Sequence, residues 1–379
     1  MKAKKQAHYK GGFSGGMLYF LSDYTGIFGP FRLFEFVTFR AGGAALMSFL
    51  LVLFYGRSTA QALSRLNVRA TERLEGLVPP EFIDKEKAKT PCMGGLLVIG
   101  SILISALYWT DLSLIPLVLI GGTFLMALTG FIDDFLKVWK KDPNGMPGKV
   151  KMLMLTVTAA GVVYGFSCAP EMGDGLLRQL MVPFMKDPVW SGRLLYVLEV
   201  VVIVGASNAV NLTDGKDGLA SGCTIFCTLT YAVFAYVMGH KVFSSYLSVP
   251  YIAGAGEAVV FAAAVCGSCI GFLWHNCHPA SMFMGDTGSL ALGGAVGMLA
   301  VLARQELLLV LVGGVFVMEA VSVILQVGSF KLTGKRIFLC TPIHHHFERK
   351  GWTETQIVVR FWILAGVFAL LALATLKLR

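Results

Sequence analysis

The sequence predicts an all-α polytopic membrane protein with about ten transmembrane helices. Of its 379 residues, 55% are hydrophobic and 15% are charged, and the mean hydropathy is +0.69. Soluble domains carry roughly 25% charged residues. The apolar residues also fall in blocks of about 17 to 23, the length that crosses a hydrocarbon core. A β-barrel would instead show alternation in segments of about ten residues.

The predicted spans can be placed in order along the chain. Residues 1–16 are basic and glycine-rich without an apolar core, so we interpret them as a disordered extension or an expression remnant, not a signal peptide. Residues 17–379 are predicted to form a single transmembrane domain. The ten predicted spans cover residues 33–55, 93–109, 114–132, 152–168, 194–210, 219–238, 258–274, 289–303, 307–330 and 358–376.

The distribution of basic residues predicts the orientation. The loops after the odd-numbered spans hold eighteen Lys and Arg residues, against eight on the opposite side beyond residue 16. Cytoplasmic loops are enriched in these residues, so the first set is predicted to be cytoplasmic. The four lysines within residues 1–16 reduce this difference without reversing it. Basic charge confined to loops suits anionic lipid and phosphate-bearing substrates better than nucleic acid.

Four polar patches lie at ends of spans, and all four fall in the predicted cytoplasmic set. They are Asp133-Asp134, residues 211–220, residues 282–286, and the run His344, His345 and His346. Charged side chains are costly at bilayer depth, so polar groups concentrated at the ends of apolar helices indicate a site. A random scatter would divide the patches between the two faces. The sequence therefore predicts cytoplasmic catalytic loops that form one site.

The adjacent carboxylates of Asp133 and Asp134 are predicted to end the third span. Such a pair can bind a divalent cation or supply a general base. Lysines follow at positions 137, 140, 141, 149 and 151. Magnesium prefers oxygen ligands and bridges substrate phosphates, so carboxylates beside lysines suit a diphosphate substrate. The alternative is an ordinary charged loop edge with local ion pairs.

The next two patches each allow two interpretations. Asn208, Asn211, Asp214 and Asp217 recur every third residue, which places them on one helix face or, because glycines intervene, in a polar turn. Asp286 stands between glycines just before a span. It either lines an anion-binding helix N-terminus or acts as a simple N-cap.

The histidine run and two charges within spans complete the candidates. Histidines 344–346 can ligate a metal, move protons or hydrogen-bond phosphate, unless they are ordinary surface residues. Glu319 and Arg40 lie inside predicted spans. Buried charges of this kind usually face the bundle interior or a water-filled cavity, and these two are also candidate partners of one another.

Cysteine and histidine patterns give little support for a redox or zinc site. Most of the eight cysteines lie within spans, where cysteine behaves as a small hydrophobic residue. Cys266 and Cys269 have redox-type spacing but lie in mid-span, so we interpret them as packing residues. The candidate ligands in residues 275–278 are too compressed for the usual zinc spacings.

Five motifs occur in order along the chain: KTPCMGG at 89–95, FIDDFLK at 131–137, NLTDGKDGLA at 211–220, FMGDTGS at 283–289 and TPIHHHFE at 341–348. Together they resemble the bacterial phospho-N-acetylmuramoyl-pentapeptide transferase family. The resemblance runs from about Met17 to the C-terminus. Any one motif alone would be weak, whereas five in order are specific.

The resemblance implies ten transmembrane helices, a homodimer, and a Mg²⁺-dependent site on the cytoplasmic face of the bacterial cytoplasmic (inner) membrane. It implies transfer of phospho-MurNAc-pentapeptide from UDP-MurNAc-pentapeptide to undecaprenyl phosphate. The products would be lipid I and UMP, for peptidoglycan synthesis and so for the cell wall, cell shape and cell division. The lipid bilayer would be a partner and nucleic acid would not. A prenyl-phosphate N-acetylhexosamine-1-phosphate transferase and an ion-coupled transporter are the alternatives.

The same resemblance assigns roles to the matching residues. Asp286 would ligate magnesium, with Asp133 and Asp134 as further candidate ligands that handle the lipid phosphate or its proton. Phe283 would stack on uracil, and the three histidines would meet the diphosphate or the sugar. The substrate-binding residues would be Lys87, Lys137, Lys149, Lys151, Asn208, Asn211, Asp214, Asp217, Asn276 and Phe283.

Two positions depart from the family pattern. The family usually has Thr where Cys92 stands, so this chain lacks a hydroxyl donor there. The family usually has Leu where Lys216 stands, so this chain places a cation between two carboxylates. That cation either acts on these carboxylates, points to the aqueous mouth of the site or meets phosphate, and the sequence does not distinguish these roles.

Overall fold

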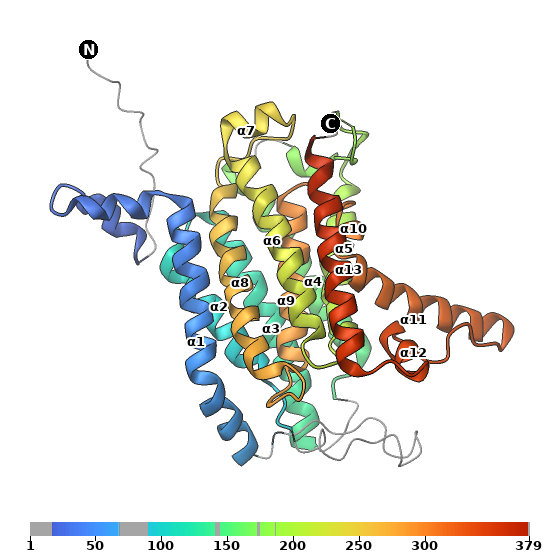
Figure 1. Ribbon diagram of the computed structural model, residues 1–379. Coiled ribbons are helices and arrows are strands. Elements are labelled where there is room, and N and C mark those ends of the chain that lie inside the picture. Colours follow the sequence, from blue (N-terminus) through green and yellow to red (C-terminus); the bar gives the residue numbers. More distant parts are fainter. Residues whose placement is uncertain are drawn as a thin grey trace.

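The computed structural model describes residues 17–66, 68, 90–140, 145–172, 175–185 and 187–377 (Figure 1). Within these ranges, nine helices are long and apolar enough to cross a membrane, which confirms the predicted all-α polytopic class. They are α1 (Val37–Arg65), α3 (Leu114–Lys140), α4 (Gly148–Ser167), α5 (Leu195–Thr213), α6 (Leu219–Gly239), α8 (Ala255–Asn276), α9 (Gly285–Leu302), α11 (Gly314–Thr333) and α13 (Glu354–Ala374). The helix α2 (Gly95–Trp109) is apolar but shorter. It occupies the second predicted span.

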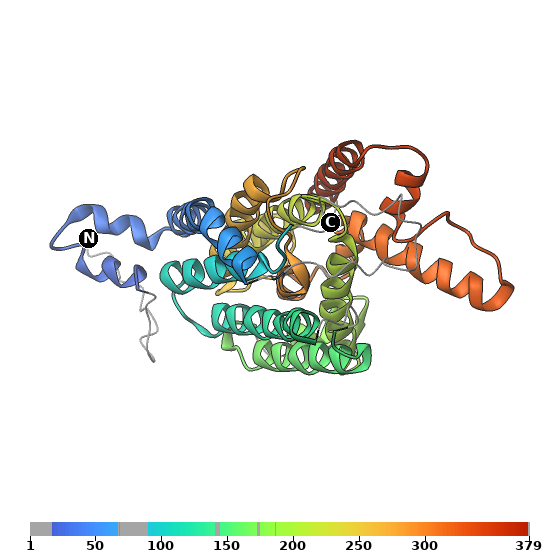
Figure 2. The same ribbon diagram turned by 90° about the horizontal axis from the view of Figure 1, so that it is seen from below.

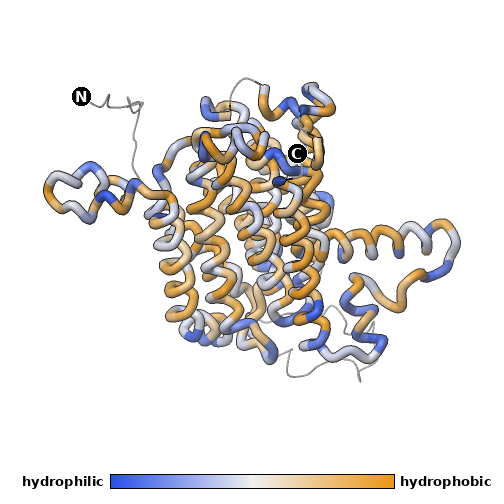
Figure 3. Tube along the Cα trace, turned by 45° about the horizontal axis from the view of Figure 1, so that its top comes forward, coloured by the Kyte–Doolittle hydropathy of each residue, from blue (hydrophilic) through white to orange (hydrophobic). Residues whose placement is uncertain are grey.

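Shorter elements connect the bundle. They are α7 (Lys241–Tyr246), α10 (Leu309–Val312), α12 (Ile343–Arg349), the 3-10 helices Tyr19–Tyr24, Gly29–Glu35, Pro170–Met172, Leu176–Arg178 and Thr375–Lys377, and the antiparallel strands β1 (Gln179–Leu180) and β2 (Trp190–Ser191). Helix α1 begins and α13 ends at the same end of the bundle (Figure 1). Apolar residues cover the sides of the bundle, and polar residues gather at its two ends (Figure 3).

Helix α9 forms the centre of the bundle. Nearly all of its residues are buried, and α3 and α5 pack along it, with α2, α6 and α8 also in contact. Small residues allow this close approach, as is usual between membrane helices. At Gly293, for example, an added Cβ would lie 2.5 Å from the carbonyl oxygen of Ala206 on α5. Glycine is therefore required there because backbone meets backbone.

Several predicted helix boundaries were wrong, and α1, for example, continues to Arg65, beyond the predicted end at residue 55. Helix α3 continues past Asp134 to Lys140, so the two carboxylates lie within a helix and not at its end. Helix α9 begins at Gly285 and so includes Asp286 in its first turn. The predicted span 307–330 is broken at Gly313 into α10 and α11. Hydropathy marks where apolar residues stop, whereas the helical hydrogen bonds continue into polar sequence.

Helix α11 leaves the bundle at an angle and projects from its side (Figures 1 and 2). Its first residue, Gly314, packs against the ring of Phe368 on α13. A Cβ added there would lie 2.5 Å from the ring. The close approach of these helices therefore occurs at the break, and the rest of α11 extends away toward α12.

Buried charges within the bundle are paired. Arg40 on α1 binds Glu257 on α8 through two hydrogen bonds of 2.6 Å, so the alternative that Arg40 and Glu319 are partners is wrong. Arg304 pairs with Glu199 at 2.7 Å and with Glu306 at 2.5 Å. The sequence shows which charged residues lie within helices. It does not show how each helix is rotated about its axis, and this rotation determines which partner a charged side chain reaches.

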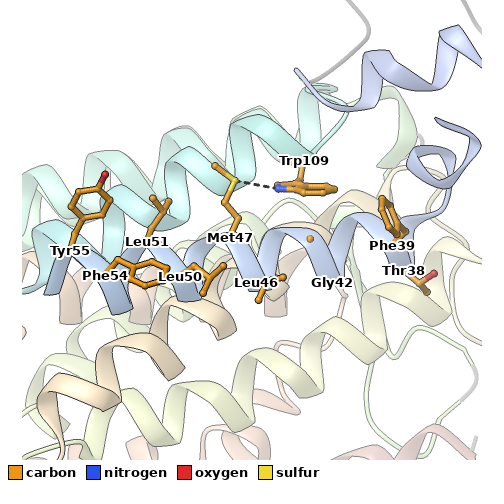
Figure 4. A pocket seen from close by; sticks show the side chains of 11 residues that line it. Thr38, Phe39, Gly42, Leu46, Met47, Leu50, Leu51, Phe54, Tyr55 and Trp109 are labelled. Carbon is orange, nitrogen blue, oxygen red and sulfur yellow. Dashed lines mark hydrogen bonds between the residues drawn. The ribbon is translucent and has the colours of Figure 1, made fainter. Parts of the chain in front are cut away.

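An apolar groove of about 770 Å³ runs along α1 (Figure 4). Its lining is Thr38, Phe39, Gly42, Gly43, Leu46, Met47, Leu50, Leu51, Phe54, Tyr55 and Trp109. The indole Nε1 of Trp109 donates to the sulfur of Met47 at 3.4 Å. This lining lacks carboxylate, ammonium and imidazole groups, so the groove does not offer the chemistry of the predicted site.

Candidate active site

Asp286 is the residue at which four helices meet. Its Oδ2 accepts hydrogen bonds of 2.7 Å from the ammonium groups of Lys137 on α3 and Lys151 on α4. Its Oδ1 accepts a hydrogen bond of 2.7 Å from the amide of Asn211 on α5. Charge-assisted bonds of this length are strong and directional. Asp286 lies at the second position of α9, and the N-cap residue Met284 makes no side-chain capping bond. The simple N-cap interpretation of Asp286 is therefore wrong.

Asp134 holds the start of α9 in place. One of its oxygens accepts from the Thr287 backbone N–H at 2.8 Å and from the Thr287 hydroxyl at 2.7 Å. The other accepts from the Asp286 backbone N–H at 3.2 Å. A carboxylate at the N-terminus of a helix also interacts favourably with the helix dipole. Asp134 thereby fixes the main chain that carries Asp286.

Asp133 makes the closer contacts with the lysines, although Lys137 Nζ also lies 3.6 Å from Asp134 Oδ1. Its Oδ2 lies 2.8 Å from Lys137 Nζ and 3.2 Å from Lys151 Nζ, and its Oδ1 accepts from the Met146 backbone N–H at 2.6 Å. Each ammonium therefore bridges Asp133 and Asp286. We call Asp133, Lys137, Lys151, Asn211 and Asp286 the Asp286 cluster. Asp133 and Asp134 thus have different surroundings, although they are adjacent in the sequence, and the sequence alone could not predict this difference.

The loop between α5 and α6 brings Asp214 close to this cluster. Helix α5 ends at Thr213, so the one-face interpretation holds for Asn208 and Asn211 but fails for Asp214 and Asp217, which lie beyond the helix. Burial raises the pKa of Asp214 well above its ordinary value, and the nearby carboxylates of Asp286, Asp134 and Asp217 raise it further. A raised pKa allows this carboxyl to retain a proton and donate a hydrogen bond.

Asp217 lies in a second group with His278 and Glu354, the Asp217 cluster. His278 Nδ1 lies 3.0 Å from Asp217 Oδ2, and the Asp217 backbone N–H donates to Glu354 at 2.9 Å. Candidate ligand atoms of these three residues lie within 4.8 Å of one another. Nearby, Asn276 accepts from the Gly218 backbone N–H at 3.0 Å. The sequence analysis considered His278 only within the compressed pattern at residues 275–278 and discounted it. It did not single out Glu354, because these three residues are distant in the chain and match no ligand spacing.

Phe283 is held by a short backbone pairing with the segment before α2. The Gly94 backbone N–H donates to the Phe283 carbonyl, and the Phe283 backbone N–H donates to the Pro91 carbonyl, both at 2.8 Å. Cys92 lies between these points. Burial raises the pKa of its thiol, and nearby Asp134 raises it further. Cys92 is therefore a neutral thiol.

The three histidines on α12 have three different environments. His344 is buried, and its Nδ1 lies 3.1 Å from Glu319 Oε1 on α11. Burial lowers the pKa of His344. His345 Nδ1 lies 2.9 Å from Glu348 Oε2, and His346 Nδ1 accepts from the Leu339 backbone N–H at 3.1 Å. Glu319 thus pairs with His344, a partner that its position in the sequence did not reveal.

The structure brings only some of the predicted site residues together. Asn208 lies one turn before Asn211 and donates to the Val204 carbonyl at 2.8 Å. Lys149 is exposed at the start of α4. Lys87 lies outside the described residues. Thr287, which donates to Asp134, and Ser289, which accepts from Asn211 at 2.9 Å, were not singled out from the sequence.

The pairing of Glu348 predicts a pH dependence of stability. The hydrogen bond from His345, together with the Lys216 ammonium, lowers the pKa of Glu348 from 4.5 to about 2. A carboxyl whose pKa is lower in the folded state stabilises the fold above its unfolded pKa, and this stabilisation is lost as pH falls toward the folded pKa. The thermal midpoint of wild type should therefore drop more steeply below about pH 4.5 than that of Glu348→Gln. Parallel profiles of the two proteins in detergent would contradict this expectation.

Comparison with known proteins identifies the class and then the family. Residues 116–304 match glycosyl transferase family 4, and this region contains Asp133, Lys137, Lys151, Asn211 and Asp286. By fold and site the chain is therefore a membrane-embedded transferase. A relative named phospho-N-acetylmuramoyl-pentapeptide-transferase from Methylacidiphilum infernorum is 47% identical over 377 residues, covering 96% of this chain and 100% of the relative.

Two further relatives carry the same name. The protein from Desulfotalea psychrophila is 49% identical over 93% of this chain and 97% of the relative. The protein from Leptospira biflexa is 44% identical over the same shares of each chain. The chain belongs to the phospho-N-acetylmuramoyl-pentapeptide-transferase family.

Proposed function

We propose that this chain transfers phospho-MurNAc-pentapeptide from UDP-MurNAc-pentapeptide to undecaprenyl phosphate, giving lipid I and UMP. The observation that carries the proposal is the Asp286 cluster, where carboxylates, two ammonium groups and an amide meet in a chain of this family. One substrate is a lipid and the other is soluble in water. A polar cluster where membrane helices end can receive a lipid phosphate from the bilayer and a nucleotide from the solution.

The proposed reaction exchanges one phosphoanhydride (P–O–P) bond for another. An oxygen of the lipid phosphate attacks the phosphorus next to the sugar. The bond from that phosphorus to the bridging oxygen breaks, and UMP leaves with the electron pair. A phosphate monoester is already a competent nucleophile near neutral pH, so we favour direct attack without a covalent intermediate on the protein. Positioning and electrostatics then supply most of the catalysis.

The described residues divide this work. Lys137 and Lys151 would offset the charge of the diphosphate, because their ammonium groups already lie among carboxylates at the cluster. Asp133 would accept or orient the proton of the lipid phosphate, since Asp134 is occupied in holding α9. A protonated Asp214 would donate a hydrogen bond to a substrate oxygen.

The nucleotide would bind beside the second group of polar residues. Asp217, Asn276 and Phe283 all lie on segments next to the start of α9 or the loop after α5. We propose that Phe283 stacks on uracil and that Asp217 and Asn276 offer hydrogen bonds. On the resemblance alone, Lys149 remains a proposed phosphate contact, and Lys87 remains a proposed substrate-binding residue near the uracil.

We propose Mg²⁺ as the cofactor. Oxygens of Asp133 and Asp286 lie 2.8 Å and 2.7 Å from the Lys137 ammonium, so these two carboxylates are close enough to share one cation. Two carboxylates and the nearby Asn211 amide are the oxygen donors that magnesium prefers. When bound, the ion would neutralise the diphosphate and the developing charge on the leaving UMP.

The cluster would face the cytoplasm, and the protein would lie in the bacterial cytoplasmic (inner) membrane. The excess of basic residues in the loops at this end of the bundle supports that orientation. A homodimer is proposed from the family resemblance. Its test is the mass of the protein after extraction from the membrane, measured by light scattering with the detergent contribution subtracted.

The test of function is release of UMP from UDP-MurNAc-pentapeptide by the purified protein with undecaprenyl phosphate. We expect turnover with Mg²⁺ and near-complete loss after chelation, because the diphosphate charge is then uncompensated. Turnover of UDP-GlcNAc but not of the muramoyl donor would contradict the proposal and favour a hexosamine phosphate transferase. Flux across liposomes without UMP release would favour a transporter.

A further inference from the structure

Lys216 is the residue that the family pattern leaves unexplained, and the structure gives it a partner. It lies in the loop between α5 and α6, between Asp214 and Asp217. Its side chain is only 7% exposed, and its Nζ lies 2.6 Å from Glu348 Oε1 on α12. The Lys216 ammonium therefore forms an ion pair with α12, the helix that carries the three histidines, and does not extend into water.

The partner of Lys216 also binds a histidine. The second oxygen of Glu348 lies 2.9 Å from His345 Nδ1. The pKa of Glu348 is lowered to about 2, first by His345 and also by Lys216, so this carboxylate is ionised near neutral pH. An ionised carboxylate only accepts hydrogen bonds, so His345 Nδ1 carries the hydrogen. In the neutral ring, Nε2 then remains to accept a hydrogen bond or a proton.

The loop and α12 are also in close contact next to Lys216. A Cβ added at Gly215 would lie 2.6 Å from His344 Nε2, so the imidazole packs directly on the loop backbone. On its other side, His344 is held by Glu319. The Lys216–Glu348 pair thus closes a contact surface between the loop that carries Asp214 and the helix that carries the histidines.

We propose that Lys216 is a positioning residue that fixes the orientation of α12, and through Glu348 the tautomer of His345, relative to the loop beside the Asp286 cluster. This inference rests on the proposed function, because it assigns the histidine helix a part in the transfer reaction. Lys216 acts through Glu348 and not on the substrate. The alternative is that Lys216 leaves Glu348 and binds a donor phosphate directly.

A double-mutant cycle separates these two roles. It compares wild type, Lys216→Met, Glu348→Gln and the double variant, measuring kcat and the KM for UDP-MurNAc-pentapeptide in UMP release. Lys216→Met should lower kcat about five- to tenfold and change KM less than about twofold, because alignment is lost while substrate contacts remain. In the Glu348→Gln background the same change should cost less than about twofold.

Two further variants serve as controls for the double-mutant cycle. Lys216→Arg keeps the charge and should retain at least about half of the wild-type kcat. Lys350→Met removes an exposed cation at the end of α12 and should leave kcat unchanged. Equal losses from Lys216→Met in both backgrounds, with KM raised, would overturn the proposal and show direct phosphate binding.

A second measurement does not depend on turnover. The thermal midpoints of the same four proteins should also be non-additive, because the pair contributes to stability as well as to alignment. If wild type releases no UMP while the midpoints remain coupled, the proposed function fails and the Lys216–Glu348 contact stands. If the midpoints are additive and Lys216→Met has normal turnover, the positioning role is wrong whatever the function.

Discussion

Replacement of Asp286 by alanine is expected to abolish Mg²⁺-dependent UMP release while the protein remains folded. Asp286 receives hydrogen bonds from Lys137, Lys151 and Asn211, each at 2.7 Å. Its loss removes the carboxylate around which these groups are arranged. Loss of one well-placed electrostatic group costs about 100- to 1,000-fold in kcat. We expect a loss of at least that size in kcat.

Two variants show whether the loss is one of charge or of folding. Asp286→Asn keeps the shape of the side chain and removes its charge, so it should be nearly as inactive as Asp286→Ala. Asp187→Ala, an exposed position in the loop before α5, should behave as wild type. Size-exclusion profiles and thermal midpoints of all three establish that they are folded. Near-normal UMP release by folded Asp286→Ala would exclude Asp286 from the site.

A methyl group added at Gly130 is expected to disturb the same site from the neighbouring helix. The Cβ of alanine at this position of α3 would lie 2.5 Å from the carbonyl carbon of Asp286 and 2.6 Å from the backbone nitrogen of Thr287. Both neighbours are backbone atoms, so α3 and α9 must move apart. Such overpacking typically costs about 1–3 kcal/mol of stability.

The same movement should impair activity. It displaces the Thr287 backbone N–H, which donates to Asp134 at 2.8 Å. We expect Gly130→Ala to lose at least about tenfold in kcat and to unfold at a lower temperature. The matched control is Gly121→Ala on the same helix, where an added Cβ meets nothing within 4 Å. A wild-type midpoint and rate for Gly130→Ala would show that the contact between α3 and α9 does not position Asp286.

Much of the fold could be predicted because membrane helices follow simple rules of length and hydropathy. Each of the ten predicted spans overlaps a helix of the described chain, and only the ninth was interrupted. The break at Gly313 escaped prediction because apolar residues continue on both sides. Next to this break, Gly314 packs against Phe368, a contact between residues distant in the sequence.

The candidate site was predictable in its residue types but not in its pairings. Motif positions pointed to Asp133, Asp134 and Asp286, and the structure places them together. The division between Asp134, which holds α9, and Asp133, which faces two lysines, depends on how α3 is rotated. The same limit explains Arg40, whose partner is Glu257 and not Glu319. A linear sequence records which charges are buried but not which neighbours they face.

The central position of α9 has a consequence for how the protein is made. The helices that enclose α9, namely α2, α3, α5, α6 and α8, all precede it in the chain. Because synthesis proceeds from the N-terminus, all of these surrounding helices are made before α9. Asp286, at the start of α9, emerges only after its partners on α3, α4 and α5. Each group that pairs with this carboxylate has therefore already been synthesised when α9 packs into the bundle.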